Sequence, residues 1–262
     1  MKQNLKLSVM VLALVCVSAI KSNAQNMELG LRYEPEFSVL MNSNDKNASP
    51  ALEYTSHFTY FNLGVGTVFN FNKNVGLAID VLFSREGQAF SGNFNDTNSS
   101  KATYASVVRT QAYLNNLVIT GDYVALAELN FIKLPIMLSL TTDNTNPIFL
   151  TLQVGPQINF LYNVAQEVNH TDEAYPNTNI TPIDLYKSIT IDGVAALGLG
   201  FNITPHMVFT AQFRYDYGFE DIENKNVMVS YYGAPATHFY SSDRQATHTA
   251  TYGLLIGLNI KL

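Results

Sequence analysis

The stretch AQFRYDYGFED, residues 211–221, places aromatic and charged side chains in alternation. Read back to Met207, one face of a β-strand carries the apolar residues, and the other face carries polar ones that include Arg214 and Asp216. The pattern continues to Phe219, so it is longer than the roughly 5–6 residues of a usual soluble strand. The segment is long enough to cross an outer membrane, since a tilted strand needs about 9–11 residues to do so. The segment therefore predicts a membrane-spanning strand.

The two charges of this segment decide which face meets lipid. A lysine or arginine on the lipid face near the membrane midplane costs roughly 2–4 kcal/mol. A slip by one residue would place both Arg214 and Asp216 on that face. We therefore expect the aromatic face to meet lipid and the charges to point into a barrel lumen. A soluble β-sandwich is the alternative, but its outer face would then be a continuous apolar belt.

Seven further segments show the same two-residue period. They are residues 27–41, 61–71, 75–83, 123–140, 148–160, 189–203 and 251–262. Segment 123–140 is less regular, because Leu129 and Phe131 share one phase whereas Leu134 starts the other. A β-bulge near Phe131–Ile132 would reconcile the two halves, and Pro135 fits a locally unpaired site.

The connectors between these segments alternate in length. Short ones fall at 72–74, 141–147 and 204–206, and long polar ones at 42–57, 88–122, 162–187 and 221–247. Short turns on one rim and long loops on the other are typical of an outer-membrane barrel, with periplasmic turns and extracellular loops. The predicted fold is all-β: an eight-stranded antiparallel up-and-down transmembrane β-barrel.

The first 24 residues predict a cleaved signal peptide. Lys2 and Lys6 precede an apolar run at 7–20, and small residues precede a cut between Ala24 and Gln25. The run is too short for a spanning helix. A lipoprotein cut at Cys16 is the alternative. We expect residues 1–24 to be the signal peptide and 25–262 to form one barrel domain in a Gram-negative outer membrane.

Cleavage would leave an acidic chain without cysteine. Removal of Lys2, Lys6 and Lys21 lowers lysine plus arginine from 15 to 12 against 21 acids, so the formal net charge changes from −6 to −9. Such a chain is a poor partner for nucleic acid. The single cysteine, Cys16, leaves with the signal peptide, so no disulfide or thiol chemistry is expected.

Several strand segments resemble a known family. The stretches LFSREGQAF (82–90), NFIKLPIMLSL (130–140), LQVGPQINFLYN (152–163), DLYKSITIDGVAALGLGF (184–201) and FRYDYGFEDI (213–222) are similar to PorT-type outer-membrane β-barrel proteins of Bacteroidetes. The resemblance implies the fold and the compartment. For some members it also implies a link to a secretion system, and none of these stretches is a catalytic motif.

Charged residues of the inward phase form the candidate site. They are Arg32, Glu34, Glu36, Asp80, Glu86, Glu128, Asp192, Arg214 and Asp216, with Lys133 as a further candidate. The interior of an eight-stranded barrel is just wide enough for side chains, and buried charges there must be paired. One interpretation is a polar plug that holds the strands in register. The other is a narrow cation-leaning pore, gated by lumen ion pairs around Arg32 and Arg214 that exchange partners.

Catalytic chemistry has little support in the sequence. His248 begins the last strand near the outer rim and follows Ser241, Ser242 and Asp243, so a lipid-modifying enzyme at the rim is the third hypothesis. No nucleophile motif surrounds these serines, and the other histidines lack the spacing of metal ligands. We therefore expect a non-enzymatic protein without metal or cofactor.

The long loops indicate how such a protein would act. They are rich in Asn, Ser, Thr and Tyr, and the last loop contains Tyr231 and Tyr232. Exposed aromatic side chains can stack on sugars or bind protein. The expected partners are outer-membrane lipid, the barrel-insertion machinery, and a protein or glycan at the extracellular loops. The predicted function is that of a structural or interaction protein that presents four long surface loops.

Overall fold

The computed structural model describes residues 27–43, 53–93, 122–169, 182–229, 237–238 and 244–262. The predicted signal peptide and much of the four long loops lie outside these residues. Among the described residues, no helix is long and apolar enough to cross a membrane. A short 3-10 helix, η4, covers Pro182–Leu185.

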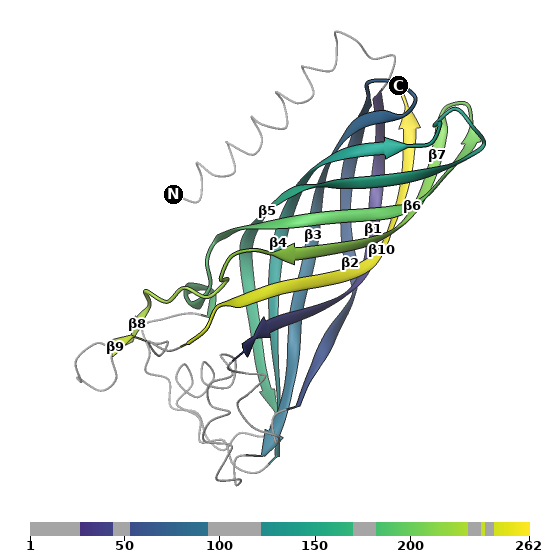
Figure 1. Cartoon of the computed structure of the whole chain (residues 1–262). Coiled ribbons are helices and arrows are strands. Elements are labelled where there is room, and N and C mark those ends of the chain that lie inside the picture. Colours follow the sequence, from purple (N-terminus) through teal and green to yellow (C-terminus); the bar gives the residue numbers. More distant parts are fainter. Residues whose placement is uncertain (1–26, 44–52, 94–121, 170–181, 230–236, 239–243) are drawn as a thin grey trace.

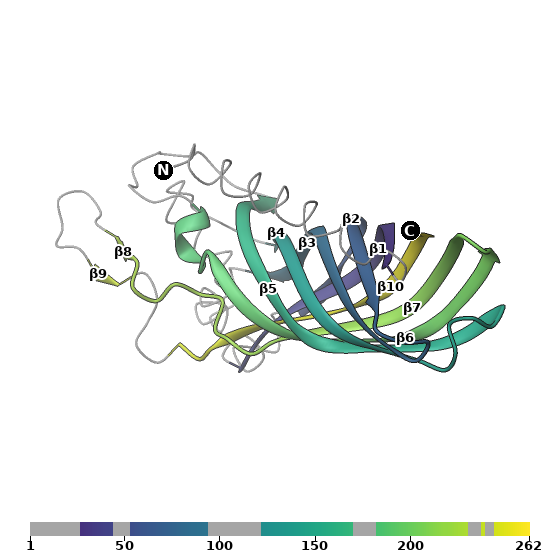
Figure 2. The same ribbon diagram turned by 90° about the horizontal axis from the view of Figure 1, so that it is seen from above.

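Eight long strands form a closed antiparallel barrel. They are β1 (Met27–Asn42), β2 (Glu53–Asn70), β3 (Val75–Asn93), β4 (Asp122–Thr141), β5 (Ile148–Asn169), β6 (Ile189–Thr204), β7 (Met207–Gly218) and β10 (Thr247–Lys261). Each strand pairs with its neighbours in the chain, and β1 pairs with β10 to close the ring (Figures 1 and 2). A small hairpin of β8 (Met228–Val229) and β9 (Thr237–His238) lies apart from this sheet. The predicted fold class is confirmed.

The short connections all lie at one end of the barrel, as the sequence predicts. In the β2–β3 turn, Oδ1 of Asn72 accepts hydrogen bonds from the backbone N–H groups of Asn74 (2.8 Å) and Val75 (2.9 Å). In the β4–β5 turn, the carboxylate of Asp143 accepts bonds from the hydroxyl of Thr145 (2.6 Å) and from Nζ of Lys73 (3.0 Å). Side chains of two different turns therefore bind to each other at this rim.

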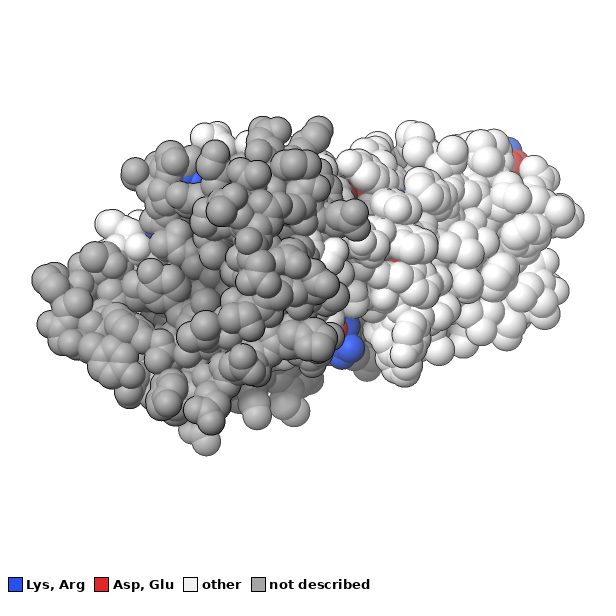
Figure 3. All heavy atoms as spheres, turned by 90° about the horizontal axis from the view of Figure 1, so that it is seen from below, with Lys and Arg blue, Asp and Glu red and all other residues white. Residues whose placement is uncertain are grey.

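The two faces of the wall differ as the alternation predicts. On β7, Phe213 is 59% exposed and Tyr215 is 44% exposed, whereas Arg214 and Asp216 are almost fully buried. The exposed side chains of the other strands are mainly Leu, Ile, Val and Phe. Figure 3 shows one side of the molecule, where the outer surface of the described barrel carries very few charged side chains. The outer surface therefore suits a hydrocarbon environment.

The predicted bulge in β4 is wrong in its position. β4 keeps one phase throughout, and Leu129 and Phe131 point inward and are buried. The extra residue lies on β5 instead, where Asn130 pairs with Asn163 but Phe131 pairs with Leu161. Apolar side chains occupy this part of the lumen, so the rule that only polar residues point inward fails there.

A second irregularity interrupts the β2–β3 ladder. Its Cα pairing passes from Ser56 with Gln88 directly to Leu63 with Phe83. Side chains complete the hydrogen bonding of β3 in this interval. Oδ1 of Asn62 accepts a bond from the backbone N–H of Arg85 (2.9 Å). The hydroxyl group of Ser38 on β1 binds the backbone of Gly87.

Candidate functional site

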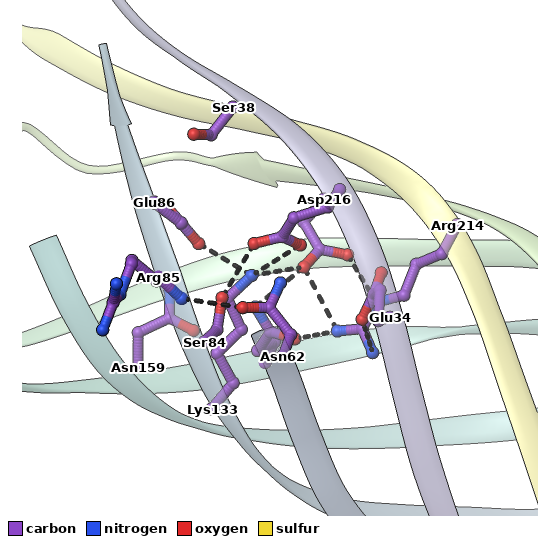
Figure 4. A network of polar contacts seen from close by, with 12 residues as sticks. Glu34, Ser38, Asn62, Ser84, Arg85, Glu86, Lys133, Asn159, Arg214 and Asp216 are labelled. Atoms are coloured by element: carbon purple, nitrogen blue, oxygen red, sulfur yellow. Dashed lines mark hydrogen bonds and ion pairs between the residues drawn. The ribbon is translucent and has the colours of Figure 1, made fainter. Parts of the chain in front are cut away.

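Lys133 lies at the centre of the lumen and is fully buried. Its Nζ is 2.7 Å from Oε1 of Glu86, 3.2 Å from Oδ2 of Asp216 and 3.5 Å from Oε2 of Glu36. Figure 4 shows the carboxylates of Glu86 and Asp216 directed toward the lysine from different strands. One ammonium group thus compensates three buried carboxylates, each of which would be costly without a partner.

Arg214 completes this cluster from β7. Its Nε and Nη2 donate to the two oxygens of Asp216 at 2.8 and 3.1 Å, which is a bidentate pair. Nη2 also donates to Oε1 of Gln157 on β5, and Nη1 lies 3.5 Å from Oε2 of Glu34 on β1. Asp216 therefore joins the two cations, Lys133 and Arg214, in one network.

The central cluster connects strands that are far apart in the chain. We define it as Glu34, Glu36, Glu86, Lys133, Gln157, Arg214 and Asp216, which come from β1, β3, β4, β5 and β7. Ser84 of β3 adds a hydrogen bond of 2.8 Å to Oε1 of Glu36. Interactions across the lumen therefore join strands that do not pair in the wall.

A second buried ion pair involves Arg32. Its Nε lies 3.0 Å from Oδ1 of Asp80, and its Nη1 donates to Oδ1 of Asn259 at 2.5 Å. Nδ2 of Asn259 in turn donates to Oε2 of Glu28 at 3.1 Å. Gly66 leaves room for this pair, because a Cβ atom at Gly66 would meet the side chains of both Asp80 and Arg32.

Eight of the nine predicted lumen charges are buried inside the barrel, and so is Lys133. Asp192 is one of the eight, and it lies opposite Gln157 of the central cluster in the β5–β6 ladder. Glu128 is the exception: its Oε1 lies 3.2 Å from Nε of Arg85, whose side chain is 49% exposed. The misplaced bulge explains this error, because β4 without a bulge directs residue 128 outward together with residues 130 and 132.

The lumen above and below the charges is also filled. Toward the loops, Leu40, Leu129, Phe131 and Leu161 are buried on the inward face. Toward the turns, a cavity of about 30 Å³ is lined by residues that include Arg32, Gln153 and Asn259. A cavity must exceed about 10–15 Å³ to hold a water molecule, so this space suits one or two waters.

Several uncharged residues also belong to the site, although the sequence pattern did not predict them. Gln157, Ser84 and Asn62 bind the charged groups or the backbone next to them. All three lie on the inward phase of their strands, and this phase is the signal that could have found them. Their specific partners come from other strands, so spacing within one strand does not reveal them.

The rim at the long-loop end of the barrel contains a separate buried ion pair. Nη2 and Nε of Arg244 lie 2.7 and 3.0 Å from the two oxygens of Glu223. Burial raises the pKa of Glu223 above its ordinary value, and the hydrogen bonds and charge of Arg244 oppose this rise. The pair fixes the segment after β7 against the segment that enters β10.

His248 points outward, as predicted. Its ring stacks on that of Tyr217 with the centroids 6.0 Å apart, and its Nδ1 lies 3.0 Å from the carbonyl oxygen of Gly218. Ser241, Ser242 and Asp243 lie outside the described residues. Within the described residues, no group of three or more His, Cys, Asp or Glu side chains could hold a metal ion.

A closed antiparallel sheet with an apolar outer surface and a charged interior defines the class of outer-membrane β-barrels. The sequence matches the family model for the outer membrane protein beta-barrel domain over residues 23–224. The chain therefore belongs to this family and is a protein of the Gram-negative outer membrane. No curated protein matches the chain significantly.

Solved outer-membrane proteins are similar to this chain at low sequence identity. Neisserial surface protein A has 10% identity and a TM-score of 0.41, and the alignment covers 90% of this chain and 97% of that one. OprG from Pseudomonas aeruginosa has 9% identity, a TM-score of 0.44 and coverage of 92% and 97%. The protease OmpT from Escherichia coli has 8% identity, a TM-score of 0.44 and coverage of 92% and 98%. These values assign no role to this chain.

Proposed function

We propose that this protein is a non-enzymatic outer-membrane barrel with a closed lumen, which acts as a rigid support for its extracellular loops. The observation that carries the proposal is the central cluster, in which Lys133 and Arg214 are fully buried and bind carboxylates from β1, β3 and β7. A buried charge that loses its partners is costly. The cluster therefore opposes any motion that would separate these strands and open a path for ions.

Conductance in a planar bilayer tests this proposal. The experiment uses the refolded chain from residue 25 to 262, after heat-modifiable migration on a gel has shown that the barrel is folded. We expect a folded protein that produces no steady openings. Steady openings carried by the folded barrel would contradict the closed lumen.

A narrow cation-leaning pore is the second candidate function. The observation in its favour is the charge balance of the lumen within the described residues, where seven buried carboxylates face three buried cations, Arg32, Lys133 and Arg214. The carboxylates are those of Glu28, Glu34, Glu36, Asp80, Glu86, Asp192 and Asp216. Ion pairs that exchange partners would then form the gate. If this function is correct, Arg214→Ala changes the conductance or the gating of the channel. An unchanged current in this variant would remove the gate from consideration.

The role of the loops follows from the proposed support function. The segments similar to PorT-type proteins of Bacteroidetes favour a link to a secretion system, in which the loops bind a partner protein. Binding to a glycan is the other option, because the loops combine amide and aromatic side chains. Affinity capture from outer membranes with the intact barrel, compared with a variant in which residues 94–121 are replaced by a short Gly-Ser linker, distinguishes a loop partner from a wall partner.

A further inference from the structure

The lipid-facing wall is indented where β5, β6 and β7 adjoin. The indentation has a volume of about 440 Å³ and an almost wholly apolar lining. Gly155, Pro156 and Gly193 form its floor, and Val154, Tyr215 and Phe219 stand around it. We call this feature the β5–β7 groove. It lies within the apolar surface described above, so lipid is the medium that fills it.

The groove follows from the residues of its floor. Gly193 has no side chain to fill the space, and the next outward-facing residue of β6 is only Ala195. A Cβ atom at Gly155 would meet the backbone of Ile136 and Met137 on β4, so this glycine allows the two strands to approach closely. The ring of Phe219 lies directly over Gly193, since a Cβ atom there would be 2.7 Å from a ring carbon. The neighbouring β4–β5 ladder is interrupted between Pro135 with Gln157 and Leu138 with Val154. The floor is therefore built of backbone and of short side chains.

A cation lies beyond the loop end of the groove. Nζ of Lys187 is 3.8 Å from a carboxylate oxygen of Glu220, the residue that follows Phe219, and both side chains are about two-fifths exposed. A surface pair at this distance is weak. The backbone N–H of Lys187 donates to the carbonyl oxygen of Ile222 at 2.8 Å, which fixes the position of the residue. An anion can therefore compete with Glu220 for the ammonium group.

We propose that the β5–β7 groove binds one phosphate-bearing lipid, with an acyl chain against Pro156, Ala195 and the ring of Phe219 and the phosphate at Nζ of Lys187. Lipid chains are as apolar as the groove, so selection rests on close packing against the floor and on the charge at Lys187. Glu220 opposes the phosphate and is displaced from Lys187 on binding. The site requires the outer-membrane location but is independent of whether the lumen conducts.

A tryptophan reporter tests this site cleanly, because the chain contains no tryptophan. The variant Tyr215→Trp places the reporter in the groove, and Leu254→Trp places it on the lipid-facing surface of β10, outside the groove. Each variant is reconstituted in phosphatidylcholine vesicles that contain a small fraction of brominated phosphatidylglycerol. We expect the reporter at 215 to be quenched several-fold more than the mole fraction of brominated lipid predicts, and the reporter at 254 only in proportion to it.

Two second-site variants keep the test decisive. Both Lys187→Gln and Ala195→Phe, introduced separately with Tyr215→Trp, should return the quenching to the proportional value, because they remove the cation or fill the groove. Both positions lie on the outer surface of the wall or beyond it, and gel migration verifies folding. Proportional quenching at 215 in the parent, or excess quenching that survives Lys187→Gln, would overturn the proposed lipid site.

Discussion

The hydroxyl oxygen of Ser38 lies 2.7 Å from the backbone nitrogen of Gly87 and 3.0 Å from its carbonyl oxygen, although β1 and β3 are not neighbours in the wall. It accepts a hydrogen bond from the N–H and donates one to the C=O. A serine side chain thus takes the place of the backbone partner that the interrupted β2–β3 ladder does not supply.

Ser38→Ala should destabilise the barrel because it leaves both groups of Gly87 without this partner. An unsatisfied buried polar group costs about 1–3 kcal/mol. The free energy of unfolding in urea, followed by circular dichroism of the refolded protein in detergent, measures the loss. Ser188→Ala is the matched control, because Ser188 is exposed. Equal stability of the two variants would show that Ser38 is not needed to satisfy β3.

Lys133→Met should be among the most destabilising single substitutions in the lumen. It removes the cation shared by Glu36, Glu86 and Asp216, and breaking a buried ion pair costs about 3–5 kcal/mol. Urea unfolding again gives the value. Adding Glu86→Gln to Lys133→Met should restore part of the stability, since it removes one of the uncompensated carboxylates. No recovery in the double variant would mean that the loss arises from packing and not from charge.

Arg244→Met should loosen the rim segment after β7. Without Arg244, Glu223 keeps a buried carboxylate that has lost its bidentate partner. The backbone N–H groups of Lys187, Ile222 and Asn224, which bond across this segment, should then exchange with deuterium at least roughly tenfold faster. Amides of β7 serve as the internal reference and should not change. Unaltered exchange at Ile222 would argue against a role of the ion pair in fixing this segment.

The turn that contains Asp143 should weaken in acid. Hydrogen bonds from Thr145, together with Lys73, lower the pKa of Asp143 from 3.8 to about 2. A carboxyl group whose pKa is lower in the folded than in the unfolded protein stabilises the fold at pH values above its unfolded pKa. This contribution is lost as the pH falls through the folded pKa. The stability difference between the parent and Asp143→Asn should therefore shrink between pH 3.8 and about 2. A carboxyl titration by NMR in micelles measures the pKa directly, and an ordinary value would contradict the prediction.

The positions of the strands could be predicted from the sequence because a membrane requires apolar side chains at every second residue of a spanning strand. Arg214 and Asp216 alone fix the phase of β7, since the opposite phase would place both in lipid. The short turns could also be predicted, because they contain Asn and Asp residues. The side chains of Asn72 and Asp143 accept hydrogen bonds from the backbone N–H groups two residues further on.

The parts that could not be predicted depend on contacts between distant segments. Leu129 and Phe131 look lipid-facing in sequence, and only their position beside Val164 and Leu161 explains why they point inward. The resulting phase error placed Glu128 in the lumen. Likewise, no local pattern links Arg214 to Gln157, which lies 57 residues earlier in the chain.

The central cluster has a consequence for how the protein is assembled. Glu34 lies on the first strand and Arg214 on the seventh in the order of the wall, and in a sheet still open between β1 and β10 five strands separate them. Only docking of β10 against β1 brings the two side chains to their distance across the lumen. Ring closure and the pairing of Glu34 with Arg214 therefore occur together. A sheet that stays open leaves Glu34 without this cation, and because an unpaired buried charge is costly, the interior favours the closed ring.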